Sequence, residues 1–552
     1  MVYYKDKQNI RCEEVIEMEK ELEQNTLAET AKQVYSMITS AFICVILGVF
    51  PLYYHDYYFD ILTAKYKFYW VTVLVFLAAC LIASLVFAFI DRMEYEGVHT
   101  RKVLKQFTLS NLKKQPPAYK MLFLFWLFCV ISTLQSDYVY ESFWGNEGRF
   151  NGLFLLTLYA VGTVLVAKLA EVRSWQLDLF LLSSLLVCLF GITDYFRMDL
   201  LGWKQNVEAS QGDIFTSTIG NVNTYTAYIG IMLGVSGSLF VKEKNLFRSI
   251  WYYILSAIGF VAMLMGQSDN AYLALAMLFT ALPFFVYKNT KEISRYAVLA
   301  ATFFSALKLV EVISREMADI VIGFSGIIQV LGSNPLMLPF IVFVWAIALG
   351  FWMLSKRQNE QSEKKLGERL RKIWIAVLAV GVLVVVLVLI DANLLGHAER
   401  YTSVSGYVVF NDYWGTNRGY GWRAAWESYI KQPFLHLLFG YGPDTFGILT
   451  WDYREEALEL FNIYFESAHN EFLQYLVTIG PFALLAYLLF LGDSVRQMGK
   501  RAEKQPVVIA CLMAVLCYNA QALVNINLPI ATPIMWMLLG IGLALCRKAS
   551  QE

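Results

Sequence analysis

Charged side chains are scarce in this chain. Asp, Glu, Lys and Arg make up 16% of its 552 residues, whereas a soluble protein carries about 25%. Hydrophobic residues make up 57%, and they come in long runs. A helix needs about 20 mostly apolar residues to cross the roughly 30 Å hydrocarbon core of a bilayer. Many runs reach that length, so the sequence predicts an all-α polytopic membrane protein.

Motifs for metals and nucleotides are missing. The eight cysteines show no C-x-x-C spacing, and all but Cys12 lie in an apolar run or at its end. This pattern indicates neither a zinc site nor a disulfide framework, and it favours cysteine as a small apolar residue. The chain also lacks H-E-x-x-H, a Walker A loop and the D-x-D triplet that holds the metal of a sugar nucleotide. We therefore expect no metal, no cofactor and no nucleic-acid partner.

The apolar runs define about 14 candidate spans by length. The region 312–335 is ambiguous, and we interpret it as a re-entrant or interfacial helix. The candidate spans are 34–54, 68–90, 119–135, 150–170, 176–194, 221–241, 249–266, 270–287, 294–312, 336–355, 372–391, 468–491, 506–525 and 531–546.

Lys and Arg gather in alternate connections between these spans. Cytoplasmic loops carry an excess of both residues. With the N-terminus inside, all the basic connections fall on the cytoplasmic face, and an even number of spans places both termini there. The basic connections are 91–118, 242–248, 288–295, 356–372 and 492–505.

The sequence divides into four parts. Residues 1–33 are polar and predict a cytosolic N-terminal segment with a short amphipathic helix and no cleavable signal peptide. Residues 34–391 form an N-terminal transmembrane bundle, and 468–552 hold the C-terminal transmembrane helices. Between them, 392–467 is far longer than an ordinary connection and rich in aromatic residues. We expect it to form a large extracytoplasmic loop with interfacial helices.

Four polar clusters lie near span ends on the predicted external side. Because polar groups at membrane depth are costly, such clusters tend to line cavities or sites. Arg149 in the first cluster, and Asn221 and Asn223 in the second, either line a site or cap and anchor helices. The clusters are WGNEGRFNGLF (144–154), GNVNTYTAYI (220–229), a stretch of the long loop (417–446) and SAHNEFLQYL (467–476).

The last cluster contains one of only five histidines. His469 stands where a polar stretch becomes apolar, at the expected start of a helix. An unperturbed pKa near 6.5 makes histidine a natural proton acceptor at neutral pH. Asn470 and Gln474 are four residues apart and share one polar stripe. Taken alone, the pattern favours an interfacial histidine that bonds a loop over a catalytic one.

The long loop supplies two arginines. Arg418 is the first residue of RGYGW and Arg423 follows that motif, next to or within a helix predicted over 419–432. Pro433 ends this helix before the turn GYGPDTF. Arginine is suited to bidentate recognition of phosphate, but it also extends toward lipid headgroups. The two interpretations are evenly balanced on these residues alone.

Taken together and in order, the clusters resemble the O-antigen ligase/O-antigen polymerase superfamily of bacterial membrane glycosyltransferases, especially members from Gram-positive-type genomes. The matching stretches are GRFNGLF, GNVNTYTAYI, RGYGW with GYGPDTF, and AHNEFLQYLVTIG, and they cover roughly 145 to 490. Many members carry Ser-Arg where this chain has Ser268-Asp269, so an acid replaces a base expected near diphosphate.

The resemblance implies a metal-independent enzyme in the bacterial cytoplasmic (inner) membrane. It would take a glycan from undecaprenyl diphosphate on the external face and pass it to a glycan or lipid acceptor. We expect a surface-polysaccharide polymerase rather than an O-antigen ligase. Membrane lipids and polysaccharide-assembly proteins are the other expected partners.

The same resemblance assigns roles to the polar residues. It makes His469 and Arg418 catalytic: Arg418 neutralises the diphosphate, helped by Arg423 or Arg149, and His469 takes the proton of the acceptor hydroxyl. Asn470 and Gln474 orient the imidazole or the acceptor sugar, and Trp422 offers a face to a sugar ring.

Two other functions remain open on the sequence. A lipid-linked oligosaccharide flippase would place charges in the middle of spans and would lack a closed cytoplasmic floor. A non-catalytic scaffold would have no reason to bring His469 and Arg418 into one pocket.

Overall fold

The computed structural model describes residues 26–106, 108–208, 211–324, 326–357 and 360–548. Helices dominate these residues, and the two strands within them, β1 (Phe215–Thr216) and β2 (Gly220–Asn221), form one short antiparallel ribbon. The predicted all-α polytopic fold is confirmed. Most of the predicted N-terminal segment, residues 1–25, lies outside the described residues.

Within this described part of the chain, ten helices are long and apolar enough to cross a membrane. Three shorter apolar helices and α23 (Thr532–Lys548) account for the remaining predicted spans. The shorter helices are α7 (Leu153–Leu169), α11 with η4 (Asn270–Ala281 and Leu282–Phe285) and α22 (Pro506–Gln521). The long ones are Thr26–Leu52 (ending in η1, Val45–Val49, and η2, Phe50–Leu52), α2 (Ile61–Glu94), α5 (Pro117–Leu134), α8 (Ser174–Tyr195), α9 (Val222–Lys242), α10 (Leu246–Met265), α12 (Thr290–Glu316), α14 (Met337–Ser355), α15 (Glu360–Asn393) and α21 (Glu471–Ala502).

Helix α9 forms the centre of the bundle. Its membrane-length window is entirely buried, and it packs most extensively against α22 and α10. Gly234 permits the close approach to α22, because a Cβ atom there would lie 2.7 Å from the backbone nitrogen of Ala514. Around this centre α21 packs on α5, α23 on α7, and α12 on α14. The buried α9 is therefore firmly packed beneath the cap end of the bundle.

The basic connections meet at one end of the bundle, here called the basic end. Lys288 forms an ion pair of 2.6 Å with Glu503, which joins two of these connections. The backbone N–H of Ala118, at the end of a third, donates to the Asp493 carboxylate near the 492–505 connection. The last helix ends here as well, where Arg547 donates to a carbonyl at the end of α7. The remaining helices of these connections are α3 (Val98–Gln106) and α4 (Leu109–Lys113).

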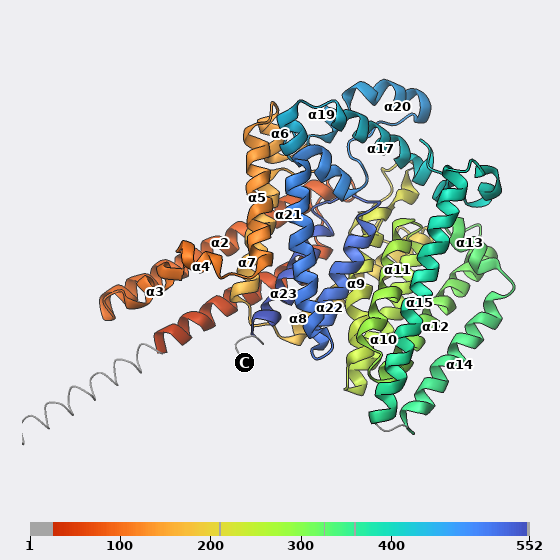
Figure 1. Ribbon diagram of the computed structural model, residues 1–552, viewed down its shortest axis with the longest axis horizontal. Coiled ribbons are helices and arrows are strands. Elements are labelled where there is room, and N and C mark those ends of the chain that lie inside the picture. The colour runs from red at the N-terminus through yellow and green to blue at the C-terminus, as the bar shows by residue number, and fades with distance from the viewer. Residues whose placement is uncertain (1–25, 107, 209–210, 325, 358–359, 549–552) are drawn as a thin grey trace, which may run out of the picture.

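The opposite end carries a layer of short helices, here called the cap, formed by residues 394–470 (Figure 1). Region 312–335 contributes one short helix beside it, α13 (Gly326–Ser333), and α6 (Val139–Trp144) and η3 (Gly212–Ile214) lie in other connections. The cap helices are η5 (Ala398–Val404), α16 (Ser405–Val408), α17 (Trp414–Ile430), α18 (Phe434–Phe439), α19 (Phe446–Leu449), η6 (Trp451–Tyr453) and α20 (Arg454–Phe461).

Candidate active site

A cavity of about 410 Å³ lies between the cap and the ends of α9 and α11. It brings together three of the residues singled out in the sequence: Arg418 from the cap, His469 from the start of α21, and Asn223 from the first turn of α9. We call it the histidine cavity. Its other polar lining includes Gln267, Ser268, Asp269, Tyr272, Tyr407 and Thr416.

Arg418 is placed by an unusual turn. Gly415, Thr416 and Asn417 all have positive φ, between 59° and 67°, a region that costs free energy for residues other than glycine. Gly419 then passes so close to the carbonyl of Asn411 that a Cβ would lie 1.9 Å from its oxygen. This contact explains the first glycine of RGYGW. The turn holds Arg418 with only 8% of its surface exposed.

The Arg418 guanidinium keeps most of its donors unused. Its Nη1 donates to the carbonyl of Gly415 at 3.0 Å, and among the described residues no carboxylate lies within ion-pair distance. Burial lowers the pKa of Arg418, although the charge of Asp269 opposes this shift. A buried cation without a close partner favours the binding of an anion.

Asp269 stands in the histidine cavity where the resemblance led us to expect a base. Its Oδ1 accepts a hydrogen bond of 3.0 Å from the Tyr407 hydroxyl, which ties the cap to the start of α11. The neighbouring Ser268 donates to the side-chain oxygens of Asn223 and Asn270. Asn223 is therefore held in place by α11, and its side chain faces the cavity.

The backbone around His469 is clamped from two sides. The indole Nε1–H of Trp422 donates to the Ala468 carbonyl at 2.9 Å, and the Gln474 side-chain oxygen accepts from the Ala468 N–H at 2.9 Å. Asn470 caps α21, because its Oδ1 accepts from the N–H groups of Phe472 and Leu473. Trp422, Asn470 and Gln474 thus converge on the peptide segment that carries His469.

The imidazole of His469 is poised as a neutral base. His469 has a positive φ of 46°, and its buried Nδ1 has no hydrogen-bond partner within the described chain. Burial, followed by the charges of Arg149 and Arg418, lowers the pKa of His469 to about 3. At neutral pH the ring is therefore uncharged and able to accept a proton.

Arg149 approaches the same histidine from another side. Its Nη2 lies 3.7 Å from Glu466, and its buried Nε has no hydrogen-bond partner among the described residues. The loop that carries it is folded by Asp444 of GYGPDTF, whose carboxylate accepts from the N–H groups of Asn146 and Asn151. Burial raises the pKa of Asp444 to about 6.

Two roles in this part of the site were missed on the sequence. Asp444 was expected only to form part of a turn, yet its hydrogen bonds join two of the four polar clusters. Glu471 is a fully buried carboxylate that accepts from the hydroxyls of Tyr487 and Tyr518, and with Arg149 it lines a small cavity of about 20 Å³. The one available signal was the presence of acids within motifs otherwise rich in Gly and Asn.

Two predicted substrate-binding residues lie elsewhere. Arg423 is bound by carboxylates: its Nε and Nη2 donate to Asp412 at 3.0 Å, and Nη2 also donates to Glu456 at 2.9 Å. The hydrogen bond to Asp412 is the largest cause of its raised pKa. Asn221 caps α9 by accepting from the N–H of Asn223 at 2.8 Å. Neither side chain lines the histidine cavity, and the same holds for Arg149, Trp422, Asn470 and Gln474, so Asn223 is the predicted substrate-binding residue that does.

No group of three or more His, Cys, Asp or Glu suited to a metal ion occurs within the described residues. The polar groups that line the histidine cavity are a neutral imidazole, the Arg418 cation, the Asp269 carboxylate, hydroxyls and amide groups. Such a set can bind an anion and accept a proton at one place.

Comparison with known protein families gives a match that includes part of this site. Residues 337–488 match the model of a family described as O-antigen ligase. The chain thus carries an O-antigen ligase domain over these residues. The match bears out the resemblance over residues 337–488, which include the third and fourth polar clusters, and it supports a membrane glycosyltransferase of the O-antigen ligase family. No curated protein matches the chain.

The matched stretch contains α14, α15, the whole cap and the first half of α21. Arg418, Trp422 and His469 lie inside it. The opposite wall of the histidine cavity, with Asn223 and Asp269, comes from helices outside the match, so the O-antigen ligase domain and the preceding bundle build the cavity jointly.

Proposed function

We propose that the histidine cavity is the active site of a glycosyltransferase that uses a glycan on undecaprenyl diphosphate as donor. One observation carries the proposal: a neutral imidazole and a buried arginine without a carboxylate partner line the same cavity. The reaction needs those two groups, because a diphosphate must be held while an acceptor hydroxyl loses its proton.

The chemical step follows from their placement. Arg418, with Arg149 nearby, binds the diphosphate and stabilises the charge that grows on it as the anomeric C–O bond breaks. The acceptor hydroxyl oxygen forms the new bond to the anomeric carbon, and His469 takes its proton. The products are the extended glycan, undecaprenyl diphosphate and a protonated imidazole, which returns its proton to solvent. General-base assistance of this kind typically contributes about 10²–10⁴ in rate.

The membrane orientation follows from the two ends of the bundle. Lys and Arg are concentrated at the basic end, which the positive-inside rule assigns to the cytoplasm. The cap and the histidine cavity then face the external side of the bacterial cytoplasmic membrane, where lipid-linked glycans await transfer. Both termini lie on the cytoplasmic side in this orientation.

Among members of the superfamily, we favour a surface-polysaccharide polymerase over an O-antigen ligase. The resemblance to members from Gram-positive-type genomes supports this choice. The acceptor is then another lipid-linked glycan, and the product grows by repeated transfer at the same cavity.

The flippase and scaffold alternatives fit the molecule less well. A flippase needs a route through the bundle, whereas the histidine cavity lies above α9, whose membrane-length window is completely buried. A scaffold would leave the strained turn before Arg418 and the unbonded His469 nitrogen without a purpose.

The size distribution of lipid-linked glycan in cells tests the proposal. Cells with the wild-type protein should give a ladder of sizes, whereas cells with His469→Ala should accumulate a single repeat. A second variant, His397→Ala, removes a histidine that pairs with Asp391 at 2.8 Å in the cap and should retain the ladder. Identical ladders in wild type and His469→Ala would refute the polymerase assignment.

A further inference from the structure

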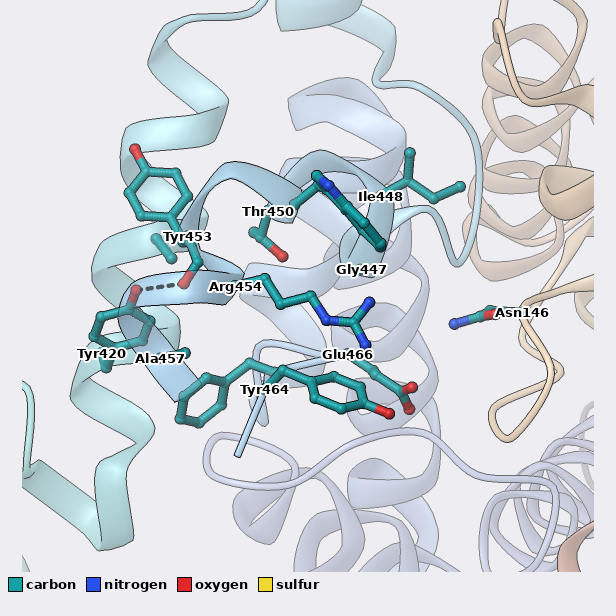
Figure 2. A pocket seen from close by; sticks show the side chains of 13 residues that line it. Asn146, Tyr420, Gly447, Ile448, Thr450, Tyr453, Arg454, Ala457, Tyr464 and Glu466 are labelled. Carbon is teal, nitrogen blue, oxygen red and sulfur yellow. Dashed lines mark hydrogen bonds between the residues drawn. The ribbon is translucent and has the colours of Figure 1, made fainter. Parts of the chain in front are cut away.

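A second cavity lies within the cap itself, with a volume of about 210 Å³. Its walls come from α17, α19, η6, α20 and the segment leading to His469, and Asn146 reaches it from the loop that carries Arg149 (Figure 2). We call it the cap pocket. The volume is below the roughly 300 Å³ typical of sites for drug-sized ligands, so it suits one small ring.

The cap pocket is lined by aromatic rings around one arginine. Arg454 stacks between two of them, with its guanidinium carbon 4.7 Å from the Trp451 ring centroid and 4.1 Å from that of Tyr464. Both rings remain open to solvent, with 61% of Trp451 and 47% of Tyr464 exposed. Large exposed rings with a polar rim mark binding surfaces rather than packing.

Among the polar groups of the cap pocket, Glu466 lies 3.7 Å from Arg149, whereas the Arg454 guanidinium is open to a ligand. Within the described residues, the Arg454 guanidinium makes no ion pair and donates no hydrogen bond, and it contacts the two rings. Asn146 lies across the pocket from it, and Glu466 lies beneath the guanidinium in the same view (Figure 2). Donors and acceptors thus surround the aromatic faces.

This combination selects the class of ligand. A sugar ring has an apolar C–H face, which suits an aromatic side chain, and a rim of hydroxyls that both donate and accept. A lipid tail would bury the Arg454 guanidinium without a partner, which is costly. The chemistry therefore favours a glycan over a lipid.

The position of the cap pocket relates it to the histidine cavity. Tyr464 and Phe465 line both, and they precede His469 by only a few residues. The α20 helix beside the pocket is in the outermost layer of the cap, far from the basic end (Figure 1). A glycan extending away from its lipid anchor in the histidine cavity would reach this layer.

We propose that the cap pocket is a sugar-binding subsite, which holds one ring of the acceptor glycan some distance from the reacting hydroxyl. The proposal rests on the transferase function proposed above. Trp451 and Tyr464 stack on the ring, and Arg454, Asn146 and Glu466 bond its hydroxyls. Acceptors long enough to reach the pocket are then bound more tightly than acceptors of one repeat.

The test uses Trp451→Ala and Arg454→Ala in the full-length protein, and neither residue lines the histidine cavity. Acceptors of one and of several repeats are compared by their KM and kcat. The KM for the longer acceptors should rise by about three- to tenfold in each variant, while the KM for the one-repeat acceptor and kcat stay unchanged. In cells, the glycan ladder should shift to shorter products.

Trp426→Ala is the matched control. Trp426 is an exposed tryptophan of α17, 53% accessible, that lies outside both cavities. Equal effects of Trp426→Ala and Trp451→Ala on the longer acceptors, or no effect of Trp451→Ala and Arg454→Ala, would overturn the proposal. Loss of transfer to every acceptor would also overturn it, because the pocket would then belong to the reaction itself.

A binding measurement separates this inference from the proposed function. Oligosaccharides of several repeats, released by mild acid from the host's lipid-linked pool, are titrated against the purified protein by tryptophan fluorescence. Wild type and His469→Ala should bind them equally, and Arg454→Ala about three- to tenfold more weakly. If His469→Ala binds the oligosaccharides as wild type does but also keeps full transfer activity, the proposed active site is refuted and the subsite is not. Equal binding by wild type and Arg454→Ala would refute the subsite alone.

Discussion

Two arginines of helix α17 lie five residues apart and have opposite surroundings. Arg423 is held by Asp412 and Glu456 through hydrogen bonds of 2.9 to 3.0 Å. Arg418 donates to one backbone carbonyl and lines the histidine cavity. The first is a cation whose partners come from the protein, whereas the second is a cation whose partner must come from elsewhere. The surroundings of a charge, rather than its identity, distinguish the structural from the functional arginine.

The same contrast separates two histidines at the cap end. His397 has its Nδ1 bonded to Asp391, whereas the buried Nδ1 of His469 has no partner in the described chain. Native proteins bond nearly all buried polar atoms. An exception beside an unpaired arginine indicates a site prepared for a substrate.

The largest expected effect is the loss of His469. His469→Ala should lower the rate of glycan transfer by about 10²–10⁴, because the acceptor hydroxyl then loses its general base. Initial rates with purified protein check this, and near-equal rates of His397→Ala and wild type provide the comparison. Similar losses in both variants would show that the two histidines do not differ in the way described.

Loss of the Arg418 charge should be almost as severe. Arg418→Gln should lower kcat by about 10²–10³, as expected for the removal of one group that stabilises charge in the transition state. Arg418→Lys keeps the charge but not the planar fork, and it should fall between Arg418→Gln and wild type. A kcat of Arg418→Gln within a factor of two of wild type would exclude Arg418 from the reaction.

A smaller loss is expected where Trp422 holds the peptide before His469. Trp422→Phe removes the hydrogen bond to Ala468 and should lower kcat by about tenfold, with little change in KM for either substrate. The added variant Gln474→Glu should not restore kcat, since Gln474 accepts from the N–H of Ala468 and does not bind its carbonyl. A rise in KM for the acceptor sugar, at constant kcat, would instead indicate that Trp422 stacks on sugar.

The pH profile should separate the free enzyme from its donor complex. The pKa of His469 is lowered to about 3, so the imidazole stays neutral at pH values well below 6.5, the ordinary histidine pKa. The value of kcat/KM should therefore stay constant as the pH falls through that range. Bound diphosphate offsets the charges of Arg149 and Arg418, so the acid limb of kcat should lie at higher pH. Acid limbs of kcat and kcat/KM that coincide near 6.5 would contradict this account.

The smallest effect is expected at the saturated arginine. Arg423→Gln should change the transfer rate by less than about threefold and destabilise the cap by roughly 1 kcal/mol at most, since its ion pairs are partly exposed. Thermal unfolding and initial rates are measured on the same preparation. A large loss of kcat without loss of stability would place Arg423 in the reaction after all.

Much of the fold could be predicted from the sequence, because hydropathy and the length of a span are local properties. Every predicted span corresponds to a helix, and the short helix α13 occupies the region that was ambiguous. The convergence of Arg418, His469 and Asn223 was predictable from clusters at span ends.

The roles of individual polar residues were less predictable, since they depend on partners distant in the sequence. Arg423 and Arg418 look alike until Asp412 and Glu456, 11 and 33 residues away from Arg423, are placed around it. Trp422 was expected to face a sugar, which stays a prediction, and the hydrogen bond from its indole to the carbonyl of Ala468, 46 residues away, was not expected. Asp444 connects to the Arg149 loop across nearly 300 residues, which no local pattern indicates.

The most direct test of the central claim is a cryo-electron microscopy map of His469→Ala incubated with its lipid-linked glycan donor. This variant should bind the donor without consuming it. We predict density for the diphosphate in the histidine cavity against the Arg418 guanidinium, with the lipid leading toward the bundle and Arg423 still bound to Asp412. Density for the diphosphate at any other place, or against Arg423, at a saturating donor concentration would contradict the account.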